Sequence, residues 1–156
     1  MSAQLLRFLF DFNHAAITRN CGGVTHDESL EAPEPAGNSA NWVLGHIVAN
    51  RASVLTLLDE TPLWSEADIA PYARGTHGIE AAAARAFDSL LLDLETTQTR
   101  IRAGIDRLTP EAFGAKAKPE DKNTRGEKLF FMQFHEAYHA GQLGLLRRLA
   151  GKPGAI

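Results

Sequence analysis

Apolar side chains recur at three- and four-residue steps in four segments of this chain, and this spacing is the strongest constraint on its fold. The spacing places the apolar groups on one face of an α-helix, whereas no segment shows the sustained alternation of a β-strand. It predicts helices over residues 2–19, about 39–58, 78–108 and 124–149. Asn38 or Ser39 is the expected N-cap of the second helix, and Thr124 with Glu127 has the spacing of a capping box.

Prolines, glycines and polar runs separate these helices. The expected connections are a loop over 22–38, an irregular crossover over 63–78, a turn over 109–111 and a loop over 116–122. The pattern predicts an all-α fold, a four-helix bundle with long crossover connections, formed as one domain over 1–156. The first half of 124–149 is apolar on nearly all sides, so we expect this helix to be the most buried.

Composition excludes several functional classes. A formal net charge of -3 argues against a phosphate-binding surface, so nucleic acid is not an expected partner. Charged residues interrupt every apolar segment before it could span a bilayer, and the N-terminal residues carry no secretory signal, so we expect a cytoplasmic protein without a membrane partner. Cys21, the single cysteine, excludes an internal disulfide and is interpreted as an incidental free thiol in a loop.

His135 and His139 are four residues apart on a predicted helix, which places both imidazoles on one face about one turn apart. A lone buried histidine is more simply a packed, hydrogen-bonded side chain. Two buried imidazoles are costly unless all their nitrogens find partners, and one shared cation satisfies both. The pair therefore predicts a divalent metal ion held by nitrogen and oxygen ligands.

The segment from His135 to His139 reads His-Glu-Ala-Tyr-His and so matches H-E-x-x-H, the helix of zinc peptidases in which the glutamate is the general base. Glu136 would have that role here. No Asp, Glu or His follows His139, so a downstream third ligand is impossible, and strand signals for a cleft wall are missing. A metal-dependent hydrolase or peptidase is therefore the least favoured of the enzymatic readings, and a third ligand has to come from upstream.

Trp42 followed by Leu44-Gly45-His46 in the second predicted helix, and His135 with His139 followed by Gly141-Gln142 in the fourth, resemble the DinB/YfiT-like superfamily of metal-dependent enzymes. The similarity extends over nearly the whole chain, from Phe10 to Arg148. It implies a bundle with a three-histidine site in which His46, His135 and His139 bind one divalent transition-metal ion, zinc or nickel.

Three neutral imidazoles leave a bound dication its full charge and an open coordination position. Such a centre can supply a hydroxide, polarise a carbonyl or hold a thiolate, and the residues do not choose among these. The resemblance implies a thiol-dependent S-transferase or isomerase whose small-molecule substrate is a low-molecular-weight thiol. Glu136 could be a base, a partner of the ligands or a surface charge; Gln142 is an expected donor to a ligand, and Gly141 is expected to permit close helix approach.

A second hypothesis is a non-catalytic, metal-stabilised homodimer that acts as a binding or stress-response module. Trp64, Tyr72 or Phe113 would supply its apolar contact surface, and a homodimer is the expected assembly. The remaining histidines have weaker signals. His14 either points toward the cavity or packs simply against its neighbours, and His26 and His77 are expected to be solvated surface side chains.

Overall fold

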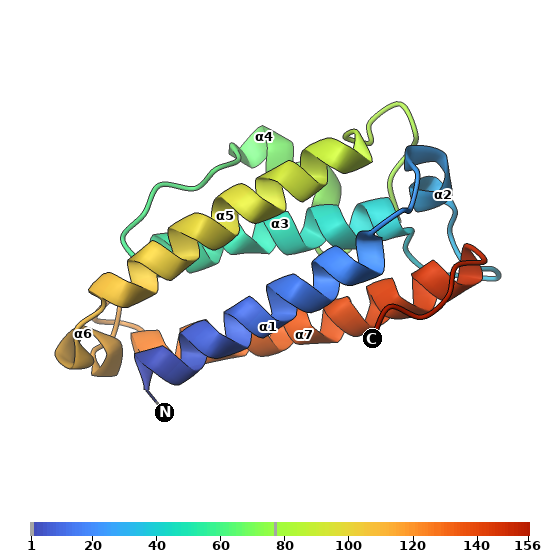
Figure 1. Ribbon diagram of the computed structural model, residues 1–156. Helices are drawn as coiled ribbons and strands as arrows, with labels where there is room; N and C mark the ends of the chain where they lie inside the picture. Colours follow the sequence, from blue (N-terminus) through green and yellow to red (C-terminus); the bar gives the residue numbers. More distant parts are fainter. Residues whose placement is uncertain (1, 77) are drawn as a thin grey trace.

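Four long helices form the bundle in the computed structural model, which describes residues 2–76 and 78–156 (Figure 1). They are α1 (Ala3–Cys21), α3 (Ala40–Leu57), α5 (Phe87–Arg107) and α7 (Arg125–Leu149). The described residues contain no β-strand, and none of their helices is long and apolar enough to cross a membrane. The predicted all-α, four-helix fold is confirmed.

The helices form two parallel pairs that run in opposite directions. Helix α1 lies beside α7, α3 lies beside α5, and each pair also packs against the other (Figure 1). The connections 22–39 and 108–124 each join helices at one end of the bundle, whereas 58–86 runs back along the bundle so that α5 begins at the same end as α3. This last crossover covers the outer face of α3, through α4 (Glu66–Ile69) and the 3-10 turn η1 (Ala70–Tyr72).

Short polar side chains fix where the long helices begin. The hydroxyls of Ser2, Ser39 and Thr124 accept from backbone amides of the first turns of α1, α3 and α7. At α7 the Glu127 carboxylate also accepts from the Thr124 amide, which confirms the predicted capping box.

The predicted start of the third helix at residue 78 was wrong, because α5 begins only at Phe87. The alanine run before it has high helix propensity, but tertiary contacts hold the backbone in another conformation. The Arg85 amide donates to the Tyr72 hydroxyl at 2.9 Å, and the Arg85 carbonyl accepts from the Asn41 side chain at 2.9 Å. These bonds take the place of the first helical turn.

Two expected irregular segments contain short helices. Within the predicted loop 22–38, α2 (His26–Leu30) begins at a capping box of Thr25 and Glu28, and after the predicted turn at 109–111, α6 (Pro110–Gly114) is capped by Thr109. The Thr-x-x-Glu spacing at residues 25–28 was a readable start signal that the nearby prolines and glycines obscured.

The prediction that the fourth helix is the most buried was also wrong. Every residue of α3 from Ala40 to Ala49 is buried, whereas on α7 Phe131 and Phe134 are both 61% exposed. Helix α3 packs against α5 and α7 and is also covered by α2 and the crossover, whereas α7 contacts α1, α3 and the short helix α6. The elements that surround α3 therefore account for its burial.

The core is divided by a layer of buried polar side chains that crosses all four helices. One apolar cluster includes Ile17, Leu44 and Leu143, and the other includes Phe10, Leu55 and Leu129. We call the residues between them the polar layer; they are Asn13, Arg51, Thr97, Gln98, Gln133 and Glu136.

Candidate metal centre

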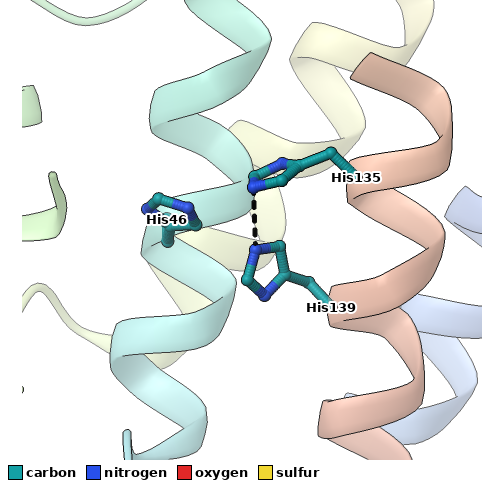
Figure 2. Close-up of side chains that lie close together, drawn as sticks. All are labelled: His46, His135 and His139. Carbon is teal, nitrogen blue, oxygen red and sulfur yellow. Dashed lines mark hydrogen bonds between the residues drawn. The ribbon is translucent and has the colours of Figure 1, made fainter. Parts of the chain in front are cut away.

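Three histidine side chains meet between α3 and α7. His46 comes from the middle of α3, and His135 and His139 come from successive turns of α7, so that the three rings face one another (Figure 2). Each offers one ligand atom, and these atoms lie within 4.8 Å of one another. His46 and His139 are buried and His135 is half-buried. We call these three side chains the histidine cluster.

Hydrogen bonds fix which ring nitrogen of two of these residues faces the cluster. His46 Nδ1 donates to the Tyr72 carbonyl oxygen at 2.6 Å, and His139 Nδ1 donates to Gln142 Oε1 at 2.6 Å. Both acceptors lack a proton, so Nδ1 is the protonated nitrogen and Nε2 keeps its lone pair. Gln142 thus contacts a ligand as expected, although its oxygen accepts where a donor was expected.

The donor set fits a divalent metal ion. His135 Nε2 lies 3.1 Å from His139 Nε2, and two lone pairs at this distance repel unless a proton or a cation lies between them (Figure 2). Nitrogen ligands about 2.0–2.1 Å from a tetrahedral zinc ion lie roughly 3.3 Å from one another. The spacing of this pair is therefore close to what a shared ion requires.

Burial prepares the histidines as ligands by disfavouring their charged forms. Desolvation lowers the pKa of His46 and of His135, and it lowers the pKa of His139 to about 4. Each imidazole is a like-charge neighbour of the others when protonated, which lowers the pKa of His135 and His139 further. All three are consequently neutral at pH 7, the state that binds metal.

The residues that precede His46 on α3 have identifiable packing roles. The Trp42 ring stacks on the His46 ring with centroids 4.6 Å apart and planes 11° apart, and its Nε1 donates to Thr76 Oγ1. Gly45 provides room for Tyr72, since a Cβ atom there would lie 2.2 Å from the Tyr72 ring. Trp42 thus packs against the His46 ring, and Gly45 leaves room for Tyr72, whose carbonyl orients that ring.

Asn50 is a neighbour of the cluster that sequence reasoning missed. It lies one turn beyond His46, where its side-chain amide donates to the His46 carbonyl at 2.8 Å and also lies 3.0 Å from His46 Nε2. The four-residue spacing from His46 was the signal for this contact. Asn50 therefore places a polar group at the edge of the cluster.

Glu136 does not join the histidine cluster. It is buried in the polar layer, where Arg51 donates from Nε to Oε2 at 2.8 Å and from Nη2 to Oε1 at 2.9 Å. The remaining Arg51 donors reach the Leu94 carbonyl, Thr97 and Gln98 on α5. Its burial excludes one of the three roles considered for Glu136, that of a surface charge.

The other polar residues singled out in the sequence lie apart from the cluster. His14 packs between α1 and α5, with Nε2 2.9 Å from Glu95 Oε2, and His26 is exposed on α2. His77 lies outside the described residues. Cys21 is the last residue of α1 rather than part of a loop, and burial raises the pKa of its thiol to about 12.

Two expectations about packing were wrong. Gly141 permits no close helix approach, since nothing lies within 4 Å of a Cβ atom built there. Trp64 and Tyr72 are 6% and 1% exposed, so they belong to the core and offer no dimer surface.

Comparison with known proteins supports the sequence resemblance. A search of curated proteins found no match. A sequence model described as the DinB superfamily matches residues 9–143, a region that includes all three members of the histidine cluster. The chain belongs to the DinB superfamily.

Proposed function

We propose that this protein binds one zinc or nickel ion through His46, His135 and His139 and acts as a metal-dependent enzyme of the S-transferase or isomerase kind. The main support is the convergence of three imidazoles whose ligand atoms lie within 4.8 Å of one another. Three neutral ligands are typical of catalytic rather than structural zinc, since they leave a position for a substrate. Membership of the DinB superfamily agrees with this proposal.

A bound dication would supply Lewis acidity that keeps a substrate thiol in its thiolate form. The chain's own residues prepare the site for such a ligand. Tyr72 and Gln142 orient two imidazoles, and burial keeps them neutral. Asn50 adds a polar side chain at the edge of the site, next to His46 Nε2.

Metal content tests the site itself. Purified protein should contain about one equivalent of zinc or nickel by elemental mass spectrometry, because the ligand atoms of the three imidazoles already lie within 4.8 Å of one another. His135→Ala should lose most of this metal and should bind added zinc far more weakly. His26→Ala, which removes an exposed histidine, is the matched control and should retain it. Equal zinc binding by His135→Ala and wild type would refute the site.

Cobalt substitution tests the proposed thiol chemistry. We expect a titration of the cobalt-loaded protein with 2-mercaptoethanol to produce a sulfur-to-cobalt charge-transfer band, as an open position accepts the thiolate. The same titration with ethylene glycol is the control and should leave the spectrum unchanged. Cobalt that binds in full but never develops the band would exclude a thiolate at the metal.

A second candidate is the non-catalytic homodimer, and one observation favours it. The neighbouring helices α1 and α7 expose large apolar side chains. They are Leu5, Phe8 and Phe12 on α1, with Phe130, Phe134, Leu145 and Leu149 on α7. An apolar face of this kind is typical of a surface that pairs with a second copy.

Light scattering tests this assembly. We expect wild type at the mass of a dimer, Phe134→Glu at the mass of a monomer, and Leu92→Glu, an exposed apolar position on α5, unchanged. A monomeric wild type would exclude the dimer.

A further inference from the structure

The histidine cluster is one end of a longer seam between α3 and α7. These helices pack against each other and run in opposite directions (Figure 1). Residues at three- and four-residue steps lie on one face of each helix, so each helix has a row of side chains along this contact. On α3 the row is His46, Asn50, Ser53 and Leu57, and on α7 it is His139, His135, Met132 and Lys128. At a rise of about 1.5 Å per residue, the α3 row is roughly 16 Å long.

Two cavities lie along the α3 row, and the larger one also reaches α7. One of about 220 Å³ lies beside His46 and Asn50 under the crossover, and one of about 530 Å³ lies farther along α3 toward Lys128. Ala52, Ser53 and Ile69 line both, so the two hollows adjoin each other. We call the combined space the seam groove. Its larger part could accept an organic group of substantial size.

The lining of the seam groove is chemically uneven. The larger cavity has mostly apolar walls, formed by Leu57, Pro62, Trp64, Ile69, Phe131 and Met132. Its charged groups are Glu66 and Lys128, which have opposite signs, and Lys128 is paired with Asp121. The groove therefore has an apolar middle without a net charge of its own.

Among the described residues that line the smaller cavity, Arg74 is the only permanently charged one. Arg74 is exposed and lines the smaller cavity together with His46. No acidic side chain in the described part of the chain pairs with Arg74, whereas Arg85 and Arg100 both have carboxylate partners. An anion bound beside the cluster would meet this guanidinium.

We propose that the seam groove binds an elongated organic anion, whose negatively charged group lies beside Arg74 and whose apolar part occupies the larger cavity. This inference rests on the proposed function, since it describes the part of the substrate that the metal does not bind. It specifies a carboxylate or a similar anion attached to an apolar chain or ring. A compact polar substrate would leave the apolar walls unused.

Calorimetry with simple carboxylates tests this proposal. The zinc-treated protein is titrated with acetate, butyrate, hexanoate and octanoate, and affinity should rise roughly fourfold per added methylene group as the chain enters the larger cavity. Hexanol, which has a matching chain without the charge, should bind at least tenfold more weakly than hexanoate. Equal affinity for acetate and octanoate would overturn the proposal.

Two variants assign the effect to the groove. Ser53→Trp should fill the junction of the two cavities and remove the gain with chain length, whereas Ser89→Trp, at an exposed site on α5, should leave it intact. Arg74→Ala should bring hexanoate down to the affinity of hexanol. A chain-length gain that survives in Ser53→Trp would place the ligand elsewhere and refute the groove.

The zinc content of each sample is measured separately, so that failure of the metal site is distinguishable from failure of the groove. Protein that holds no zinc but still shows the chain-length and Arg74 effects would refute the proposed function and support the groove. Zinc-loaded protein without the chain-length and Arg74 effects would refute the groove and leave the metal site supported.

Discussion

At the scale of single residues, the site depends on two oxygen atoms that accept hydrogen bonds from Nδ1 of His46 and of His139. These bonds keep the ring proton on Nδ1 and leave Nε2 free to bind a metal ion. The Tyr72 carbonyl binds the outer nitrogen of His46, and Gln142 Oε1 binds the outer nitrogen of His139. Such partners fix the tautomer and ring orientation of metal-binding histidines. They also raise the basicity of the inner nitrogens, and so both should contribute to metal affinity.

Gln142→Ala should lower zinc affinity by about 10- to 100-fold, the usual cost of removing a hydrogen-bond partner from a ligand. Competition with a chromophoric zinc chelator measures this change. Gly141→Ala is the matched control on the preceding residue, because a Cβ atom there meets nothing, and its zinc affinity should equal that of wild type. Zinc affinity unchanged in Gln142→Ala would show that the His139 tautomer needs no fixed acceptor.

Gly45→Ala should weaken both folding and metal binding. Its Cβ atom would lie 2.2 Å from the Tyr72 ring, so Tyr72 and the carbonyl that orients His46 would have to move. Overpacking of this kind costs about 1–3 kcal/mol of unfolding free energy. Urea unfolding and the chelator competition together test this, again with Gly141→Ala as control. Loss of stability with full zinc affinity would show that Tyr72 moves without disturbing His46.

Sequence reasoning found these residues unevenly. The four-residue spacing identified His135 and His139, because that distance lies within one helix. His46 entered only through the family resemblance, since its place opposite α7 depends on how two helices pack. The contact between His46 and Tyr72 joins residues 26 positions apart, and no local pattern contains it.

At the scale of helices, the polar layer explains how α3 and α7 hold a fixed relative position. Arg51 on α3 binds Glu136 on α7 and three groups on α5, while Asn13 on α1 donates to the Gln133 carbonyl on α7 at 2.8 Å. A slip of either helix by one residue would leave these buried groups unpaired. Since Arg51 and Glu136 are close in sequence to His46 and His135, the layer also sets the register of the histidine cluster.

Glu136→Gln should therefore destabilise the fold, by roughly 3–5 kcal/mol, because it leaves the Arg51 charge buried without its counter-ion. Chemical denaturation measures this loss, and metal analysis of the folded fraction should still find zinc. Glu95→Gln, which alters an exposed carboxylate on α5, is the control with a small effect. A Glu136→Gln variant as stable as wild type but inactive would instead support the general-base role suggested by the H-E-x-x-H match.

Helix boundaries were predictable where local chemistry decides them. Ser39 and Thr124 cap their helices as the sequence indicates, because a cap acts within one turn. The start of α5 was not predictable, because Tyr72 and Asn41, which are distant in the sequence, form hydrogen bonds with the backbone of Arg85. The order of burial failed for a similar reason, since the crossover that covers α3 is itself irregular and carries no hydrophobic period.

At the scale of the whole molecule, the buried histidines make folding depend on pH. The pKa of His139 is about 4 in the folded chain, against an ordinary value of 6.5, because burial disfavours the imidazolium. Below pH 6.5 the unfolded chain therefore binds a proton that the folded chain does not, and acid favours unfolding. The contribution is fully present above that value and is lost as the pH falls toward 4. The lowered pKa values of His46 and His135 act in the same direction.

Chelator-treated protein should accordingly be less stable at pH 5 than at pH 7, by about 2 kcal/mol from His139 alone. For a chain of this size the melting temperature should fall by roughly 4–8 °C. His139→Leu should reduce the difference, because the titrating group is removed while the buried position stays filled. Zinc-loaded protein should keep its pH 7 melting temperature to a lower pH, since the ion and the proton compete for the same nitrogens. Zinc that binds fully at pH 7 but leaves the melting temperature at pH 5 unchanged would have to bind outside the histidine cluster. Metal binding at the cluster would then not contribute to the stability of the fold.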